Sequence, residues 1–445
     1  MPIHSKQRAV IGMGKTGLSC AHFLQNHGEN FSWFDTREVP PGLSDIGKLF
    51  PDADFYCGPL DAALLCNASE IIVSPGVSVM EPALQSAVLA GISLIGDIEL
   101  FVRATNKPII AITGSNAKST VTTLVGEMAA ACGLRAGVGG NLGTPVLDML
   151  ADDAKNDCYV LELSSFQLET TFSLQAAVAI ILNISDDHMD RYNSLQDYML
   201  AKQKIYTNAH HVIFNRADSL TNPPPDTSSQ QSSFGLDDCE QGVGVAEHNG
   251  EGWLMLNGSS PLIRAADIRI AGSHNLANVA ASFAIAVAAG WDLVACANAV
   301  RQFKGLPHRC QWVAEKNGVR VYNDSKGTNI GATVAAIEGL SSNKNIVLIA
   351  GGDGKDADFS QLMPVVMQHV KQLVLIGRDA AKIAAACVGV AQAQASSMID
   401  AVQISQKIAV VGDVVLLSPA CASFDMFNDY EDRGRQFCAA VEALV

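Results

Sequence analysis

The stretch IIAITGSNAKST, residues 109–120, decides the fold of this 445-residue chain. Its first four residues are apolar and predict a buried strand, and a helix is predicted from Val121 to about Ala131. The small-residue loop between them suits phosphate, because backbone N–H groups and the helix dipole stabilise an anion there. In such a loop Lys118 adds a charge for the β- and γ-phosphates, and Ser119 is placed to ligate Mg²⁺.

This match to the generic phosphate-loop pattern is imperfect. Ile112 and Ala117 stand where that pattern has glycines, so an ordinary strand-to-helix turn is an alternative. The predicted loop comprises Gly114, Ser115, Asn116, Ala117, Lys118, Ser119 and Thr120.

Similar apolar runs recur on both sides of this stretch, each followed by a turn and a helical pattern. Such strands indicate mostly parallel sheets covered on both faces. We therefore predict an α/β protein of three domains, at residues 1–98, 99–305 and 306–445, with a surface loop at 222–233. The predicted strands are Ala9–Ile11, Phe31–Phe34, Ile71–Val73, Ile109–Ile112, Tyr159–Leu163, Ala176–Leu182, Val212–Phe214, Val319–Tyr322, Ile346–Ala350, Leu373–Ile376 and Val414–Leu417.

Composition excludes several classes of protein. Hydrophobic residues make up 48% of the chain, which is too many for a disordered protein. The net charge of −15 argues against a nucleic-acid binder, which needs excess Lys and Arg. The apolar part of the longest uncharged stretch, 270–291, is too short to span a membrane. Eleven scattered cysteines without a CxxC pair indicate reduced thiols in a cytoplasmic protein rather than a zinc site or disulfides.

A glycine-rich turn, GMGKTG at residues 12–17, follows the first predicted strand. Its glycines allow a tight turn that brings backbone N–H groups close to a phosphate, and Asp35 after the next strand suits a ribose hydroxyl. The pattern fits a nicotinamide or flavin dinucleotide, another nucleotide diphosphate, or a purely structural turn. Arg37, taken alone, is better explained as a surface charge.

Polar residues lie within or directly after two further predicted strands. Glu162 lies within an apolar run, where a carboxylate is costly unless it meets a cation, so it is a candidate Mg²⁺ ligand. The run NISDDHMD, residues 183–190, places oxygen donors and His188 at the binding edge of the sheet. Its aspartates also suit helix caps. By pattern alone, Lys202 is a solvated helix residue.

Five motifs, in this order, resemble the Mur ligase family of ATP-dependent amide ligases: residues 113–120, 162–167, 183–191, 272–278 and 306–309. The resemblance covers essentially the whole chain. It implies an N-terminal Rossmann-like uridine-nucleotide domain, a central ATP-binding domain and a C-terminal Rossmann-like amino-acid domain. It also implies that ATP converts a carboxylate into an acyl phosphate, which an amino acid's amine then captures.

Within the family, the chain resembles members that add D-glutamate to UDP-N-acetylmuramoyl-L-alanine in peptidoglycan precursor synthesis. The features are residues 12–17 with 35–37, 323–329, 351–359 and 417–425, together with the lack of an Asp-Asn-Pro-Arg tetrapeptide. The alternatives are an L-alanine-adding relative, a folylpolyglutamate synthase, an NAD-dependent oxidoreductase and a nucleotide-binding regulator without turnover. The expected partners are small molecules, with no nucleic acid and no membrane insertion, and the protein is expected to be a monomer.

The resemblance also implies which residues contact the two nucleotides. ATP is expected to contact the phosphate loop together with Asn275, Asn278, Arg309 and Asp324. The UDP substrate is expected to contact Gly14, Lys15, Thr16, Gly17, Asp35, Thr36, Arg37, Ser74, Pro75, Gly76, Asn141, Ser164 and Gln167.

The remaining implied roles concern catalysis, metal binding and the amino acid. Two Mg²⁺ ions are expected at Ser119, Glu162, His188 and Lys202, with Lys202 carbamylated by CO₂. The implied catalytic residues are Lys118, His188, Lys202, Asp324 and Lys326. D-glutamate is expected at Thr328, Lys355, Ser423, Phe424 and Tyr430. Phe424 and Tyr430 stand where the family pattern has Leu and Phe, which leaves the detail of that pocket open.

Overall fold

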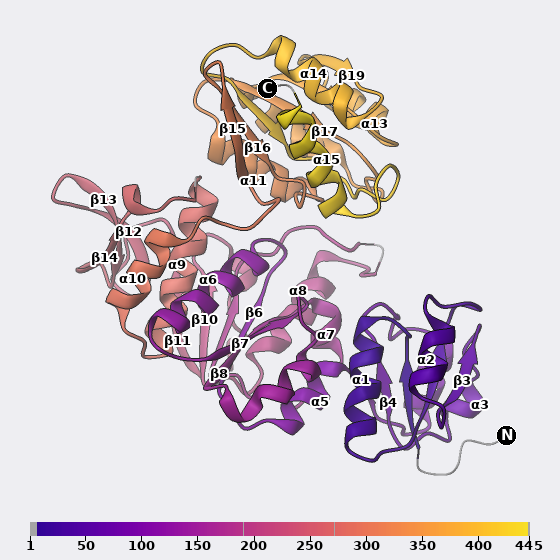
Figure 1. The fold of residues 1–445 in the computed structure, drawn as a ribbon. Helices are drawn as coiled ribbons and strands as arrows, with labels where there is room; N and C mark the ends of the chain where they lie inside the picture. The colour runs from indigo at the N-terminus through magenta and orange to yellow at the C-terminus, as the bar shows by residue number, and fades with distance from the viewer. Residues whose placement is uncertain (1–6, 190, 271, 444–445) are drawn as a thin grey trace. The chain divides into compact units, whose positions relative to one another are not determined.

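A computed structural model describes residues 7–189, 191–270 and 272–443 of the chain (Figure 1). Asp190 of the predicted 183–190 motif therefore lies outside the described residues. The chain forms two compact units. The first contains residues 1–184, 191–233 and 282–296, and the second contains 185–190, 234–281 and 297–445.

The N-terminal part of the first unit alternates strands and helices. Its elements are β1 (Arg8–Ile11), α1 (Lys15–Asn26), β2 (Phe31–Asp35), α2 (Leu43–Leu49), β3 (Asp54–Cys57), α3 (Ala62–Leu65), β4 (Ile71–Val73), α4 (Pro82–Leu89) and β5 (Leu94–Ile95).

These five strands form one parallel sheet in the order β3-β2-β1-β4-β5. Successive residues of a strand point to opposite faces. Val10 and Ile72 accordingly pack with α1, whereas Ile11 and Ile71 pack with α3 and α4. The chain runs from β1 outward to β2 and later returns to β4 on the other side of β1. The carboxyl ends of β1 and β4 are thus the switch point at which open α/β sheets bind ligands.

The central part of the first unit contains a second sheet. Its elements are α5 (Asp97–Ala104), β6 (Ile109–Thr113), α6 (Lys118–Ala131), β7 (Ala136–Gly140), the 3-10 segment η1 (Val146–Lys155), β8 (Cys158–Glu162), α7 (Ser165–Glu169), β9 (Val178–Ile181), α8 (Leu195–Gln203), η2 (Lys204–Tyr206), β10 (His211–Asn215), η3 (Ser219–Thr221) and β11 (Gln230–Phe234).

Strands β10, β9, β6, β8 and β7 pair in parallel in that order. The central strand β6 is buried along its whole length, as its continuous apolar sequence predicts. The carboxyl ends of β6, β8 and β7 therefore meet at one edge, where the phosphate loop begins.

The next stretch of chain contains an antiparallel meander and two helices. Its elements are β12 (Val243–His248), β13 (Glu251–Leu256), β14 (Ser260–Arg264), η4 (Ala265–Asp267), α9 (Ser273–Ala288) and α10 (Leu293–Gln302).

The C-terminal part of the second unit is a third α/β layer structure. Its elements are β15 (Gln311–Lys316), β16 (Val319–Asn323), α11 (Ile330–Leu340), β17 (Ile346–Ala350), η5 (Phe359–Leu362), α12 (Met363–His369), β18 (Val370–Leu375), α13 (Ala380–Ala386), β19 (Ala391–Gln394), α14 (Met398–Ile408), β20 (Val414–Leu417) and α15 (Tyr430–Glu442).

This sheet has the order β15-β16-β20-β17-β18-β19, and only the edge pair β15–β16 is antiparallel among the strands described. Leu348 packs with α11, α12 and α13 on one face, and Ile349 packs with α14 and α15 on the other. Helices on both faces bury the central strands β17 and β20 completely, which explains the unbroken apolar sequences of these two strands (Figure 1).

The α/β prediction and the predicted strands are confirmed, but the predicted loop at 222–233 is partly wrong. Its last residues belong to β11, because the polar run Gln230–Ser233 lies beside β10 and gains backbone pairing there. The meander β12–β14 was not predicted. No helix in the described part of the chain is both long enough and apolar enough to cross a membrane.

Candidate active site

A cavity of about 650 Å³ opens at the switch point of the N-terminal sheet. The loops after β1, β2 and β4 line one side, and residues after β7 with Gln167 of α7 line another. All predicted UDP-substrate residues except Gly17 and Ser164 line it, namely Gly14, Lys15, Thr16, Asp35, Thr36, Arg37, Ser74, Pro75, Gly76, Asn141 and Gln167. The volume is typical of a small-molecule site.

Asp35 holds the glycine-rich turn in place from the end of β2. Its Oδ2 accepts hydrogen bonds from the Met13 N–H at 2.8 Å and from Arg37 Nη2 at 2.7 Å. Burial raises the pKa of Asp35, but the hydrogen bonds from Arg37 and Met13 outweigh it and lower the pKa below its ordinary value. Arg37 is a half-exposed surface residue, as its sequence alone suggested, but its charge is ion-paired to Asp35.

Gly17 acts in packing rather than in lining the cavity. A Cβ atom there would lie 1.8 Å from the carbonyl oxygen of Gly12, so only glycine lets α1 start this close to the turn. Ser164 likewise lies outside the lining, but it caps α7 and contacts Gln167, which does line it.

The phosphate loop is tied to the neighbouring strand. Ser115 N–H donates to the Asn183 carbonyl at 2.9 Å, and Asn116 N–H donates to Asn183 Oδ1 at 2.8 Å. Lys118 Nζ donates to the carbonyl oxygens of Gly114 and Ser115, at 2.7 and 2.9 Å. The loop backbone is thus fixed before any phosphate arrives.

Lys202 lies at the same loop. Its Nζ donates to the Gly114 carbonyl at 3.0 Å, so two lysine side chains converge on one oxygen. Lys202 is only 1% exposed, and the pattern-based expectation of a solvated helix residue is wrong. The amphipathic period of α8 is too weak to distinguish a buried lysine from a solvated one.

Glu162 ends β8 opposite Ile112 of β6, beside the start of the phosphate loop. The residue is 2% exposed, and its Oε1 accepts from Asn141 Nδ2 at 2.7 Å. Its other oxygen, Oε2, is buried and finds no hydrogen-bond partner among the described residues. Such an oxygen is costly to bury unless a cation meets it.

This donor set fits Mg²⁺. Among the described residues, no three His, Cys, Asp or Glu side chains cluster as a metal site, so the protein would supply few ligands. Mg²⁺ is commonly held in this way, through one or two carboxylates, water and substrate phosphates.

In the second unit, three loops follow neighbouring strands at their carboxyl ends. They are residues 324–328 after β16, 351–355 after β17 and 418–424 after β20, which lies between the other two. The Ala420 N–H donates to the Gly327 carbonyl at 2.9 Å, and Asp353 and Ala422 form a two-way backbone bridge. The predicted D-glutamate residues Thr328, Lys355 and Ser423 therefore lie on loops that are hydrogen-bonded to one another.

The other two predicted D-glutamate residues differ from each other in exposure. Phe424 is 74% exposed, whereas Tyr430 is partly buried at the start of α15. Lys326 Nζ lies 3.6 Å from the centre of the Tyr430 ring, and the Lys326 N–H donates to the His308 carbonyl at 3.0 Å. Tyr430 thus helps to hold a predicted catalytic lysine.

Asp324 is buried at the same sheet edge. It accepts hydrogen bonds from the Cys310 N–H at 3.1 Å and from Ser418 Oγ at 2.7 Å. Burial raises the pKa of Asp324 to about 6, against the opposing effect of those donors and of Arg309. Perturbed carboxyl groups of this kind are frequent at functional sites.

Sequence reasoning missed Arg433 of α15, which is 1% exposed. Its guanidinium donates to the Ser325 carbonyl at 2.8 Å and to the Cys421 carbonyl at 3.1 Å, joining two of the three loops. Burial lowers the pKa of Arg433 to about 10. Nothing in the local sequence distinguishes this arginine from a solvated one.

The remaining predicted residues lie in the second unit as well. Asn275 and Asn278 are both buried on α9, where Asn278 Nδ2 donates to Asn275 Oδ1 at 3.2 Å. His188 adopts a left-handed backbone with φ of 58°, and its Nε2 lies 3.7 Å from Asp187 Oδ2. Asp187 accepts from Asn329 Nδ2 at 3.3 Å.

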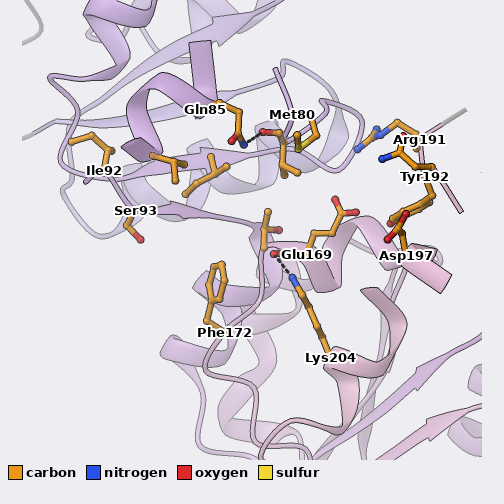
Figure 2. Close-up of a pocket in the computed structure, with 15 residues that line it drawn as sticks. Met80, Gln85, Ile92, Ser93, Glu169, Phe172, Arg191, Tyr192, Asp197 and Lys204 are labelled. Carbon is orange, nitrogen blue, oxygen red and sulfur yellow. Dashed lines mark hydrogen bonds between the residues drawn. The ribbon is translucent and has the colours of Figure 1, made fainter. Parts of the chain in front are cut away.

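A second cavity of about 670 Å³ lies in the first unit and shares no residue with the first cavity. Figure 2 shows Met80, Ile92 and Phe172 along it, with Arg191 and Lys204 among its charged groups. It contains none of the predicted site residues, so the candidate active site does not include it.

Known family descriptions match three successive parts of the chain. Three family descriptions match: "Mur ligase MurD-like, N-terminal domain" at residues 6–96, "Mur ligase middle domain" at 112–286 and "Mur ligase, glutamate ligase domain" at 308–421.

Full-length relatives decide the family. A UDP-N-acetylmuramoylalanine–D-glutamate ligase of Pseudomonas fluorescens is 51% identical over 442 residues, 98% of each chain. One of Hahella chejuensis is 50% identical over 440 residues, again 98% of each chain. This chain belongs to the Mur ligase family. The resemblance found in the sequence is thereby confirmed.

Solved Mur ligases share the fold at low identity. The UDP-N-acetylmuramate–alanine ligase of Thermotoga maritima is 18% identical, with a TM-score of 0.60 over 99% of this chain and 100% of that one. A MurF ligase of the same organism, solved in complex with ADP, is 15% identical, with a TM-score of 0.63 over 94% and 96%.

The backbone conformation of Ala117 in this Mur ligase leads to a testable prediction about stability. It precedes α6 with φ of 68°, a left-handed conformation that costs an alanine about 1–2 kcal/mol. Glycine avoids that strain but loses about 0.5–1 kcal/mol of chain entropy. We therefore expect Ala117→Gly to stabilise the Mur ligase by up to about 1 kcal/mol in urea unfolding. A clear loss of stability would contradict the left-handed backbone.

The buried carboxyl group of Asp97 makes the stability of the protein depend on pH. Asp97 is 3% exposed, and burial raises its pKa to about 6. A folded-state pKa above the unfolded one means that the ionised group costs stability at pH 8. The cost fades as pH falls through 6, because the folded protein then takes up the proton, and it vanishes below about 4.

We expect Asp97→Asn to stabilise the Mur ligase at pH 8 by up to about 3 kcal/mol, with the gain gone at pH 4. Thermal unfolding of both proteins across this pH range measures it. A gain that is independent of pH would contradict the assignment to Asp97.

Proposed function

We propose that this Mur ligase joins D-glutamate to UDP-N-acetylmuramoyl-L-alanine at the expense of ATP, in peptidoglycan precursor synthesis. The observation that carries the proposal is about 50% identity, over nearly the full length, to relatives with this named activity. The cavity at the switch point supports it, because it gathers almost the entire predicted UDP-substrate set.

The UDP end of the substrate is assigned to the loops after β1, β2 and β4. Backbone N–H groups of the turn at 12–17 suit the diphosphate, and Lys15 and Arg37 supply positive charge. Asn141 and Gln167 line the opposite side of this cavity, which leaves the muramoyl and alanyl part nearest to Glu162 and the phosphate loop.

The chemistry begins with ATP on the phosphate loop. Lys118 and the N–H groups of α6 hold the phosphates while the alanyl carboxylate attacks the γ-phosphorus. ADP leaves, and the product is an acyl phosphate. The amine of D-glutamate then attacks the acyl carbon, inorganic phosphate leaves, and one proton is released as the amide forms. Asn275, Asn278, Arg309 and Asp324 are assigned to ATP, and His188, Asp324 and Lys326 to catalysis.

Mg²⁺ would neutralise charge on the transferring phosphoryl group when bound. We assign Ser119, Glu162, His188 and Lys202 to two such ions. Glu162 supports this with its unpartnered buried oxygen. Lys202 would contribute as a carbamate, formed when its amine adds to CO₂ with loss of a proton. Its burial beside Gly114 supports the assignment, because a carbamate there would lie at the phosphate loop.

D-glutamate carries two carboxylates, so its site needs cations and fixed donors. Lys355, Thr328 and Ser423 on the joined loops of the second unit are assigned to it, with Phe424 and Tyr430 beside them. We further propose the three domains at 1–98, 99–305 and 306–445, a cytoplasmic location and a monomeric state.

Thermal stabilisation tests the substrate class directly. A ligand that binds only the folded state raises the melting temperature. We expect UDP-N-acetylmuramoyl-L-alanine to stabilise the protein and NADH to leave it unchanged, with the first effect weakened in Arg37→Ala. Stabilisation by NADH instead would favour the oxidoreductase, and stabilisation only by UDP-N-acetylmuramate would favour the L-alanine-adding activity.

A further inference from the structure

Asp97 lines the UDP-substrate cavity, but neither the sequence motifs nor the resemblance assigns it a role. It is the first residue of α5 and is 3% exposed. Oδ2 accepts from Gln167 Nε2 at 3.4 Å, whereas Oδ1 is buried and has no hydrogen-bond partner among the described residues. None of the groups that shift its pKa is a cation. A buried carboxylate without a counterion destabilises the fold, so the chain bears a cost at this position.

Both the oxygen and the nitrogen of the Gln167 side-chain amide form hydrogen bonds. Oε1 accepts from the Ser164 N–H at 3.1 Å and from Ser164 Oγ at 3.2 Å, which completes a capping box on α7. Nε2 donates one of its two N–H groups to Asp97. An amide can rotate to exchange its oxygen and nitrogen, but here each end has a matching partner. The second N–H of Nε2 is thereby presented as a donor on the residue that lines the cavity.

The backbone around this contact is also fixed. The Gly96 N–H donates to the Thr170 carbonyl at 3.0 Å, and a Cβ at Gly96 would lie 2.4 Å from Thr170 Oγ1. Glu99, one turn further along α5, accepts from the N–H groups of Phe172 and Ser173 at 2.7 and 2.9 Å. The start of α5 therefore holds α7 and the loop after it, and of these contacting residues Asp97 is the one that lines the cavity.

We propose that Asp97 is a positioning residue for the UDP substrate. It acts through Gln167, whose amide it orients so that an N–H group faces an acceptor oxygen, carbonyl or carboxylate, on the acyl part of the substrate. This inference rests on the proposed function, because it takes the cavity as the site of a UDP-linked acyl substrate.

The test is direct binding of UDP-N-acetylmuramoyl-L-alanine, without ATP, measured by calorimetry on the full chain. Without Asp97 the Gln167 amide is no longer oriented, and its hydrogen bond to the substrate is lost. Loss of a hydrogen bond to a charged group weakens binding by about ten- to a hundredfold, so we expect that rise in Kd for Asp97→Ala. Asp97→Asn keeps an acceptor oxygen for Gln167 and should stay within about threefold of the wild type. The KM for ATP should be unchanged in both variants.

A double-mutant cycle separates positioning from a general structural role. If Asp97 acts through Gln167, adding Asp97→Ala to Gln167→Ala should weaken binding no further. Glu99→Gln is the matched control, since Glu99 is buried on the same helix and holds the loop after α7 without lining the cavity. It should lower the melting temperature and leave the Kd unchanged.

Three results would overturn the inference: full additivity in the cycle, an equal rise in Kd for Glu99→Gln, or wild-type binding by Asp97→Ala. Failure of the wild-type protein to bind the UDP compound would instead overturn the proposed function, and the inference with it.

Discussion

Lys118→Ala should reduce kcat by at least about 10³-fold, the largest effect expected of any single substitution in this Mur ligase. The physical reason is loss of the one side-chain charge that begins α6 at the phosphate loop. Without it, the β- and γ-phosphates lose the lysine charge that the loop itself supplies beside its backbone N–H groups. Phosphate release under saturating ATP measures the effect.

The fold should tolerate this change. Lys118 Nζ donates to the carbonyl oxygens of Gly114 and Ser115, which both lie within four residues of it in the same loop. Lys155→Ala is the matched control, because Lys155 is 63% exposed and paired with Asp152 on the surface. It should keep full activity. An active Lys118→Ala protein would show that ATP is not held at this loop.

Lys202→Met should lower kcat by about 10²- to 10³-fold. Methionine has a similar length, so it fills the buried site beside Gly114 but can form neither a cation nor a carbamate. Because the change removes a buried polar group, we expect no loss of thermal stability. Carbon-13 NMR of protein equilibrated with ¹³C-labelled bicarbonate should show a carbamate signal in the wild type that is absent from the variant.

Lys204→Met is the matched control for Lys202→Met, because it makes the same substitution two residues further along the chain. Lys204 is exposed, and its Nζ donates to the Glu169 carbonyl at 3.2 Å. It should retain both the activity and the NMR signal. Full activity of Lys202→Met would remove Lys202 from the catalytic set. Loss of activity in Lys202→Met, together with no carbamate signal in the wild type, would keep the lysine in the catalytic set and reject its modification.

The sequence was most informative where a motif follows a continuous apolar strand. The runs at 109–112 and 159–163 predicted buried parallel strands, and the residues after them lie at the common edge that parallel pairing requires. Period and turn chemistry are local properties, so they survive without tertiary information. The polar strand β11 was not predicted, because pairing with the backbone of β10 stabilises it and its side chains show no apolar pattern.

The burial of individual charged side chains could not be predicted from local sequence patterns. The buried positions of Lys202 and Arg433 follow from the packing of α8 and α15, and their helical patterns resemble those of solvated residues. Asp97 is similar: its sequence context indicates a helix start, where an acidic residue is ordinary. Only the fold brings it to Gln167, 70 residues away.

The most direct test of the account is phosphate release from Mg²⁺–ATP by the purified protein with UDP-N-acetylmuramoyl-L-alanine, with and without D-glutamate. L-glutamate, and UDP-N-acetylmuramate with L-alanine, serve as parallel reactions. The account predicts release only when the L-alanyl nucleotide and D-glutamate are both present, with one product heavier by one glutamyl residue. Release with UDP-N-acetylmuramate and L-alanine alone, or none with any pair, would contradict it.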